Sequence, residues 1–425
     1  MDRNDDHFYV ENARLMSYGL SNLGKVSTHI IIDGRESLEE LAGKLIGYGI
    51  SESERKNIDI LEYYTRHENP FIRRAAYTGL SLSGLIQFNP GLNNILPRGF
   101  MDEDVEVRKC SLIGYGLANL SHGDESTSEE LEQYLSDQEW KIRGAAGLAH
   151  STAFIGNPFF FDKFVSLLKS EDSPYVKVCS CWYISTAFAD TGKGIDEYAH
   201  LLSMLGDENS FFRDMACLGL GFSHLGSQDE NVDDLLRWRI AHDTHPYVRE
   251  SACFGLSLNN FRRPTQTLYD SLSKAFKDDS MIVRSGASLG VGIASMKTGS
   301  IGLDVMHQRD HSVRWGLMIS EGLAKAPHSI QGMEDAYVRW GYHIGNSFRD
   351  DLDINQESRH LGVKMFQQPI NQGLIGSGIV SENQKDAFKL FFPGFYYYTV
   401  YDSFWWGLWV LSALGNTLLT KNEKY

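Results

Sequence analysis

The sequence predicts an all-α fold, a right-handed α-solenoid (superhelix) of about ten stacked helix-pair repeats of roughly 35 residues each. Three observations predict it. A basic residue recurs at nearly constant spacing, an acidic residue precedes most of these positions by six residues, and a small residue follows each of them by eight. Since no stretch has the composition of a linker rich in Pro, Gly and Ser, one elongated array explains the 425 residues better than several globular domains.

The basic position defines the repeat. It recurs at intervals of 34 to 36 residues, and once after 30, and an apolar residue directly precedes it in every unit. Such regular recurrence indicates that each pair marks the same point of one repeating helix. We call these residues the ladder positions: Arg73, Arg108, Arg143, Lys177, Arg213, Arg249, Arg284 and Arg314.

An acidic residue stands six residues before the ladder position in six of the eight units, with His67 and Gln308 in the other two. The acid is suited to cap the following helix and to pair with the ladder arginines, which favours a structural ion-pair ladder over an anion-binding stripe. The segment before each acid carries apolar residues three and four apart and predicts an amphipathic helix, so the unit is helix, short turn, helix. The acids are Asp102, Asp137, Glu171, Asp207, Asp243 and Asp278.

A small residue stands eight residues after every ladder position, and a glycine often stands two residues before it. Because a helical glycine costs about 1 kcal/mol relative to alanine, its recurrence requires a compensating gain, which close packing of neighbouring helices supplies. The sequence therefore predicts a seam between repeats. The seam residues are Ser81, Gly116, Ser151, Ser185, Gly221, Ser257, Gly292 and Gly322.

The apolar–Arg pair with its preceding acid resembles the repeat of the HEAT family, an armadillo-like helical fold, across residues 60–325. The Gly-rich second helices, as in MACLGLGFSHLGS, are similar to proteasome/cyclosome repeats. The resemblance implies a stacked scaffold that holds protein partners, without indicating a particular complex.

Weaker copies of the pattern, one with Gly49 and Ser51, extend the array toward both ends. Terminal repeats are expected to be atypical because they cap the stack. The predicted organisation is a repeat solenoid over residues 1–347, an irregular insertion or atypical repeat over 348–387, and an aromatic C-terminal capping segment over 388–425.

Composition restricts the partners and the compartment. The formal net charge of −15 makes a surface that repels phosphate backbones, so we expect no nucleic-acid partner. Five cysteines, an odd number in a long chain, do not suggest a disulfide framework and favour a reducing compartment. The acidic N-terminal segment lacks the basic and apolar regions of a secretory signal, so we expect a cytoplasmic protein.

Motifs that suggest chemistry have simpler structural explanations. His67-Glu68 is a single His-Glu pair, whereas the di-iron hydroxylases of hypusine formation carry repeated pairs. His242 and His245 flank Asp243, which favours a polar turn over a zinc site because no second ligand pair accompanies them. No phosphate loop, G-x-S-x-G elbow or HExxH helix occurs, so we expect no catalytic residue, no cofactor and no metal. Three cysteines that follow ladder positions by four residues are predicted to be core residues: Cys181, Cys217 and Cys253.

The C-terminal segment is the most unusual part of the sequence. Residues 403–420 are uncharged, with aromatic side chains crowded at their start. Three interpretations remain open: a helix that caps the last repeat, a membrane anchor or interfacial helix, and a partner-docking segment. The candidate protein-binding residues are Phe404, Trp405, Trp406 and Trp409.

The repeat pattern favours a non-catalytic scaffold or adaptor that presents an extended surface to one or more proteins, alone or within a larger complex. Two alternatives stay open at the level of sequence. One is an enzyme or cofactor-maturation factor built on the solenoid. The other is a membrane-peripheral tether that uses the aromatic C-terminal segment.

Overall fold

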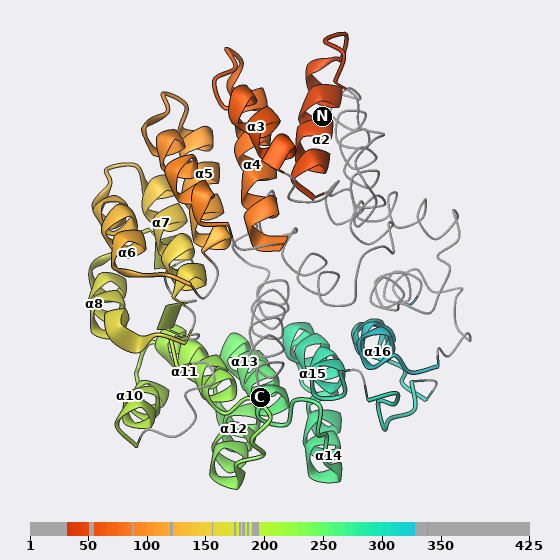
Figure 1. The fold of residues 1–425 in the computed structure, drawn as a ribbon. Helices are drawn as coiled ribbons and strands as arrows, with labels where there is room; N and C mark the ends of the chain where they lie inside the picture. The colour runs from red at the N-terminus through yellow and green to blue at the C-terminus, as the bar shows by residue number, and fades with distance from the viewer. Residues whose placement is uncertain are drawn as a thin grey trace, which may run out of the picture. The chain divides into compact units, whose positions relative to one another are not determined.

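The computed structural model describes residues 32–50, 55–86, 89–119, 122–154, 156–173, 195–296, 298–305 and 307–327, with a few positions between 176 and 188 and position 338. Within these ranges every regular element is helical, and there are fourteen α-helices and four short 3₁₀-helices (Figure 1). The all-α fold is therefore confirmed for the part of the chain that the structure describes.

The chain divides into two compact units. The helices of the first unit are α2 (Leu38–Ile50), α3 (Arg55–Tyr64), α4 (Pro70–Ile86), η1 (Pro90–Asn94), η2 (Leu96–Met101), α5 (Val105–Ala118), α6 (Glu125–Glu132), η3 (Gln133–Ser136), α7 (Trp140–Ala153) and α8 (Phe161–Ser170), with η4 (Pro158–Phe160) just before α8. The helices of the second unit are α10 (Ile195–Leu205), α11 (Ser210–Ser223), α12 (Glu230–His242), α13 (Pro246–Asn259), α14 (Gln266–Ala275), α15 (Met281–Ala294) and α16 (His311–Ala324).

Helices of two kinds alternate in each unit. Inner helices pack on one another in chain order: α2, α4, α5 and α7 in the first unit, and α11, α13, α15 and α16 in the second (Figure 1). The outer helices α3, α6, α10, α12 and α14 each pack on the inner helix that follows. The structure thus confirms stacked helix-pair repeats as the architecture within each unit.

The two kinds of helix are buried differently, and their sequences reflect this. The outer helix α12 buries one stripe, Val232, Leu236 and Ile240, which recur four residues apart on one face. The inner helix α13 is buried at every position from Glu250 to Asn259, nearly three full turns. Inner helices are therefore covered on all sides, which explains why their sequences are apolar or small throughout.

Small residues form the predicted seam between adjacent inner helices. A Cβ atom added to Gly221 would lie 2.5 Å from the Cα of Gly255, and one added to Gly292 would lie 2.6 Å from the Cα of Ser320. These distances are far shorter than ordinary contacts, so the backbones approach as closely as glycine allows. Ser81 and Gly116, at the same place in the first unit, are also buried against neighbouring repeats. The seam prediction is confirmed for these positions.

Two of the repeats depart from the predicted helix pair. Before α5, prolines at Pro90 and Pro97 replace the outer α-helix by η1 and η2, because proline lacks the N–H that a continuous helix needs. Between α15 and α16 the described residues form no helix, and Gly299 and Gly302 adopt positive φ angles of 83° and 63°. This short connection accounts for the 30-residue ladder interval.

Replacing a seam glycine tests the close approach of inner helices. In Gly255→Ala the new Cβ would overlap the carbonyl oxygen of Cys217 on α11, a backbone atom that cannot move independently. We expect a loss of about 2–3 kcal/mol in the free energy of unfolding, measured by urea denaturation.

The matched control is Gly206→Ala, where the added Cβ meets only the Ser203 carbonyl oxygen at 3.6 Å. We expect this change to shift stability by less than about 0.5 kcal/mol. Equal losses in the two variants would contradict the seam.

Candidate functional site

Each paired ladder arginine joins its own turn to the turn of the next repeat. Nη1 of Arg143 donates to the carbonyl oxygens of Asp137 and Gln138 at 2.9 and 3.1 Å. Nε and Nη2 donate to the two carboxylate oxygens of Glu171, in the next turn, at 2.8 and 2.9 Å. The same two-donor link recurs as Arg73–Asp102, Arg213–Asp243 and Arg249–Asp278. Arg284 contacts Asp310 through Nε alone, at 3.1 Å.

The structure corrects two details of the predicted ladder. At the predicted position, six residues before the ladder residue, the acid does not cap the helix itself. Asp207 accepts the N–H of Asn209 at 2.8 Å, and Asn209 is the residue that caps α11. At the last step, where the sequence places Gln308, the carboxylate comes from Asp310, two residues later. A shorter turn before α16 moves the acid from its usual place.

Arg108 departs from the ladder. Its Nε is buried without a hydrogen-bond partner, and the described residues show no ion pair between Arg108 and Asp137. The Asp137 carboxylate instead accepts the N–H of Glu139 at 2.8 Å. The first unit therefore contains both a complete ladder step, at Arg143, and an incomplete one.

These two arginines give a matched test of the ladder. Arg143→Met removes both guanidinium donors from the nearly buried Glu171 carboxylate and leaves that charge without its arginine, so we expect a loss of about 3 kcal/mol in the free energy of unfolding. Arg108→Met removes no ion pair and should cost less than about 1 kcal/mol. Urea denaturation of both variants checks this, and a greater loss in Arg108→Met would disprove the structural ladder.

The turn between α12 and α13 has a ladder acid that is bonded by two arginines. Asp243 accepts from Nε and Nη2 of Arg213 at 2.8 and 2.9 Å, from Nη1 of Arg239 at 3.0 Å, and from the N–H of His245 at 3.0 Å. Burial opposes ionisation of Asp243, but these hydrogen bonds outweigh it and lower its pKa to about 2. The carboxylate is therefore charged at neutral pH and holds this turn to two helices.

Aromatic rings lie on both sides of the same turn. On the α12 side, the rings of Trp238 and His242 stack at 5.0 Å, and the Arg239 guanidinium lies 4.9 Å from the Trp238 ring. On the α13 side, His245 and Tyr247 lie 5.6 Å apart. We call Trp238, His242, His245 and Tyr247 the aromatic turn.

Trp238 is 52 % exposed because of its place on α12. It lies two residues from both Leu236 and Ile240, and two helical residues turn through about 200°, so it points away from the buried stripe. Exposed tryptophans beside arginine are frequent anchors of protein interfaces. The aromatic turn is the candidate interaction site of the second unit.

The predicted polar turn at His242 and His245 agrees with this geometry. The Asp243 carboxylate between them is occupied by two arginines, and Nδ1 of His242 contacts the Trp238 carbonyl oxygen at 2.9 Å. In the described residues no cluster of three or more His, Cys, Asp or Glu side chains is arranged to hold a metal ion. The carbonyl oxygen of His67, from the other histidine motif, accepts a hydrogen bond from Arg73.

The second residue of each inner helix forms a row along the turns. In the first unit, Phe71, Glu106 and Lys141 occupy this position on α4, α5 and α7, and the side chains of Glu106 and Lys141 form an ion pair at 2.8 Å. In the second unit the equivalent residues of α11, α13, α15 and α16 are Phe211, Tyr247, Ile282 and Ser312. Aromatic, charged and small side chains therefore all occur at this position.

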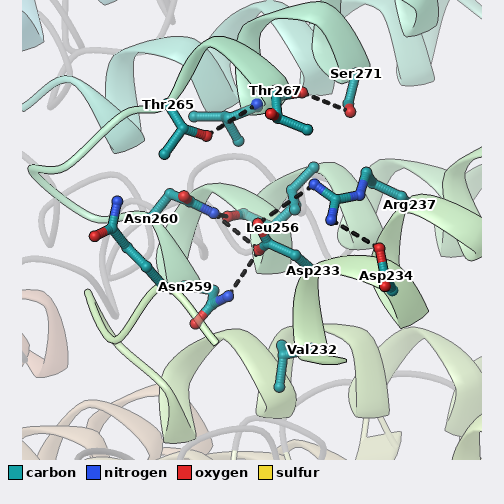
Figure 2. Close-up of polar contacts among 12 residues, drawn as sticks. Val232, Asp233, Asp234, Arg237, Leu256, Asn259, Asn260, Thr265, Thr267 and Ser271 are labelled. Atoms are coloured by element: carbon teal, nitrogen blue, oxygen red, sulfur yellow. Dashed lines mark hydrogen bonds and ion pairs between the residues drawn. The ribbon is translucent and has the colours of Figure 1, made fainter. Parts of the chain in front are cut away.

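A polar network joins the other end of α13 to α12 (Figure 2). Asp233, on α12, accepts hydrogen bonds from the amide groups of Asn259 and Asn260 at 2.7 and 2.9 Å. Burial raises the pKa of Asp233, although the two amides and Arg237 favour its charged form. The network fixes the end of an inner helix to its outer helix, so its role is structural.

Two further buried ionisable groups lie inside the repeats. Burial lowers the pKa of His150 to about 3, and its ring packs against Phe154 and Phe160 at 4.7 and 4.8 Å, so it is a neutral core residue. Burial raises the pKa of Asp214, on α11, to about 7, against a hydrogen bond with Ser251. Its Oδ1 is buried without a partner. Asp214 is therefore protonated in a substantial fraction of molecules at neutral pH.

The raised pKa of Asp214 predicts a pH dependence of stability. The unfolded chain releases this proton near pH 4 and the folded chain near pH 7, so stability falls as pH rises between these values. Asp214→Asn mimics the protonated form. We expect its free energy of unfolding to match the parent at pH 4 and to exceed it by roughly 2–4 kcal/mol at pH 8.

Denaturation at several pH values measures this difference. Asp162→Asn, a change at an exposed aspartate of α8, is the control and should show no such trend. If the free energies of unfolding of the parent and of Asp214→Asn change with pH in parallel, the folded structure does not shift the pKa of the Asp214 carboxyl.

The remaining predicted residues have mixed outcomes. Cys217 and Cys253 are fully buried in inner helices, as predicted, while Cys181 lies outside the described residues. The candidate protein-binding residues Phe404, Trp405, Trp406 and Trp409 also lie outside them and stay a prediction. Within the described residues no helix is both long and apolar enough to cross a membrane.

The stacked helix pairs make this chain a helical repeat protein in its described part. No family model matches the sequence, and no curated protein matches it. Human deoxyhypusine hydroxylase, solved in complex with glycerol, is 15 % identical over 67 % of this chain and 97 % of its own, with a TM-score of 0.27. YibA from E. coli is 16 % identical over 70 % of this chain and 100 % of its own, with a TM-score of 0.35. The first of these is an enzyme by name, and neither likeness is strong enough to favour a function.

Proposed function

We propose that this protein is a non-catalytic scaffold of HEAT-like repeats that acts in the cytoplasm and binds a protein partner through the aromatic turn. The observation that carries the proposal is the exposure of Trp238 beside Arg239, in the last part of α12, next to a turn whose backbone Asp243 holds in place. Tryptophan and arginine on a pre-organised surface bind partners at a small entropic cost.

The use of the other polar groups supports this proposal. The ladder acids Asp243 and Asp278 accept from arginines, and Asp233 accepts from two amides, so these carboxylates contribute to the fold. Burial is the main cause of the shifted pKa values of Asp214 and His150, which is typical of groups inside a packed core. The predicted tail residues Phe404 and Trp405 belong to the same proposal, as a second partner-binding segment.

Site-specific crosslinking tests the proposal. The photoreactive residue p-benzoylphenylalanine, placed at Trp238 in the full chain, should crosslink to one discrete protein in cells of the source organism. The same residue placed at exposed Glu129 on α6 is the control and should give no such adduct. Trp238→Ser should then weaken the purified complex by about tenfold or more in Kd without lowering the melting temperature.

The proposal fails if crosslinking at Trp238 gives no adduct beyond the Glu129 control. It also fails if a partner is found but Trp238→Ser leaves its affinity unchanged.

A further inference from the structure

A loop with two arginines before a threonine joins α13 to α14. We propose that Thr265, the last residue of this loop, is a phosphorylation site for an ATP-dependent protein kinase that recognises the paired arginines Arg262 and Arg263. The inference is independent of the proposed function, because it concerns neither the aromatic turn nor the partner of that turn.

The charge pattern before Thr265 is rare in this chain. Protein kinases select substrates by charge patterns, and basic residues three and two positions before a hydroxyl can bind carboxylates in the kinase cleft. In the whole sequence only two hydroxyl residues follow basic residues at both of these positions. They are Thr265, in the segment RRPT, and Ser111, in the segment RKCS. The sequence alone does not select between them.

The structure separates the two candidates. Ser111 lies within α5, is fully buried, and donates its hydroxyl to the Leu96 carbonyl oxygen, so a kinase cannot reach it in the folded chain. Thr265 is partly exposed, and Arg263 before it and Gln266 after it are exposed. The fold therefore presents one candidate at the surface and closes the other.

The backbone of the loop suits an enzyme cleft. Thr265 has extended φ and ψ angles of −105° and 159°, and Pro264 disfavours a helical conformation of Arg263. Successive side chains of an extended segment point to opposite sides, so a cleft can contact each of them separately. The carbonyl oxygen of Arg263 accepts a hydrogen bond from the Gln228 side chain at 2.8 Å, and this bond is exposed. Exposed bonds open locally at a low cost in free energy, which allows the loop to enter a cleft.

The fold can accommodate the added phosphate. Thr265 is the N-cap of α14, and its Oγ1 accepts the N–H of Leu268 at 3.1 Å (Figure 2). The positive end of the helix dipole favours negative charge at this place, and phosphate oxygens are strong acceptors. Within the described residues neither Arg262 nor Arg263 forms an ion pair, and Nε of Arg262 is buried without a hydrogen-bond partner. Two arginines that no acid neutralises thus stand within three residues of the new charge.

The reaction consumes ATP and releases ADP. The bond between the γ-phosphorus of ATP and its bridging oxygen breaks, and a bond from that phosphorus to Oγ1 of Thr265 forms. The hydroxyl proton passes to the catalytic aspartate of the kinase. A neutral side chain thereby becomes one with a charge of about −2.

Phosphorylation of the full chain by a purified arginine-directed protein kinase, with ATP and Mg²⁺, tests the site. Tandem mass spectrometry should locate phosphate on Thr265 and at least about tenfold less on Ser111. Synthetic peptides of residues 259–270 and 105–116 are the matched control. Both peptides should accept phosphate, because neither hydroxyl is buried in a peptide.

Variants test the recognition of the arginines. Arg262→Gln with Arg263→Gln should lower the rate of phosphorylation at Thr265 by about tenfold or more, because the kinase loses both charged contacts. Thr265→Ser keeps a hydroxyl and a helix cap and should remain a substrate, whereas Thr265→Val should not accept phosphate in this loop. Thermal denaturation verifies that each variant is folded.

Cells of the source organism test the use of the site. The chain isolated in the presence of phosphatase inhibitors should carry phosphate on Thr265. Absence of this phosphate overturns the inference, as does phosphorylation of the 259–270 peptide without phosphorylation of the folded chain. An unchanged rate in the double glutamine variant, or equal phosphorylation of Ser111 and Thr265 in the folded chain, likewise overturns it.

Discussion

The bidentate ion pair between a ladder arginine and the carboxylate of the next turn is the contact on which the rest of the structure depends. Nη1 of Arg249 donates to the Asp243 carbonyl oxygen in its own turn. Nε and Nη2 donate to the Asp278 carboxylate in the next turn. One side chain thus sets the shape of a turn and the offset between two repeats. Breaking such a partly buried pair leaves a charge without a partner, so the link is costly to lose even though its net contribution to stability is modest.

The ladder works together with two other contacts along each inner helix. The ladder holds the beginning of the helix, and the seam of small residues holds its second half, where Gly221 meets Gly255. The end is fixed by side-chain amides or hydroxyls. Asn260 donates to Asp233 in the second unit, and Asn119 exchanges two hydrogen bonds with Asn93 in the first. Contacts at three levels restrict both sliding and rotation, which allows small residues to pack at backbone distance.

What recurs in the sequence could be predicted, and what occurs once could not. Ladder and seam residues repeat at fixed spacing, so the helix pairs and the burial of Ser81 and Gly292 followed from the sequence. Asp310 was missed because a shorter turn moved the acid by two residues from the expected place. The bonds of Asp233 to Asn259 and Asn260 join residues 26 and 27 apart. Among the repeats that the structure describes they have no counterpart of the same residue types, so no period indicated them.

The same reasoning locates function within the repeats. A residue that every repeat needs is kept by the geometry of stacking, so its presence says little about partners. A position whose residue type changes between repeats while the stacking stays the same is not determined by the stacking. Trp238 on α12 and Ser273 on α14 occupy one position, five residues before the acid of the following turn, yet the first is aromatic and the second is small and polar. Stacking cannot select between them, because both residues fit it. Selection at this position must therefore act through what lies outside the helix pair, and the exposed Trp238 ring beside Arg239 points to a binding surface.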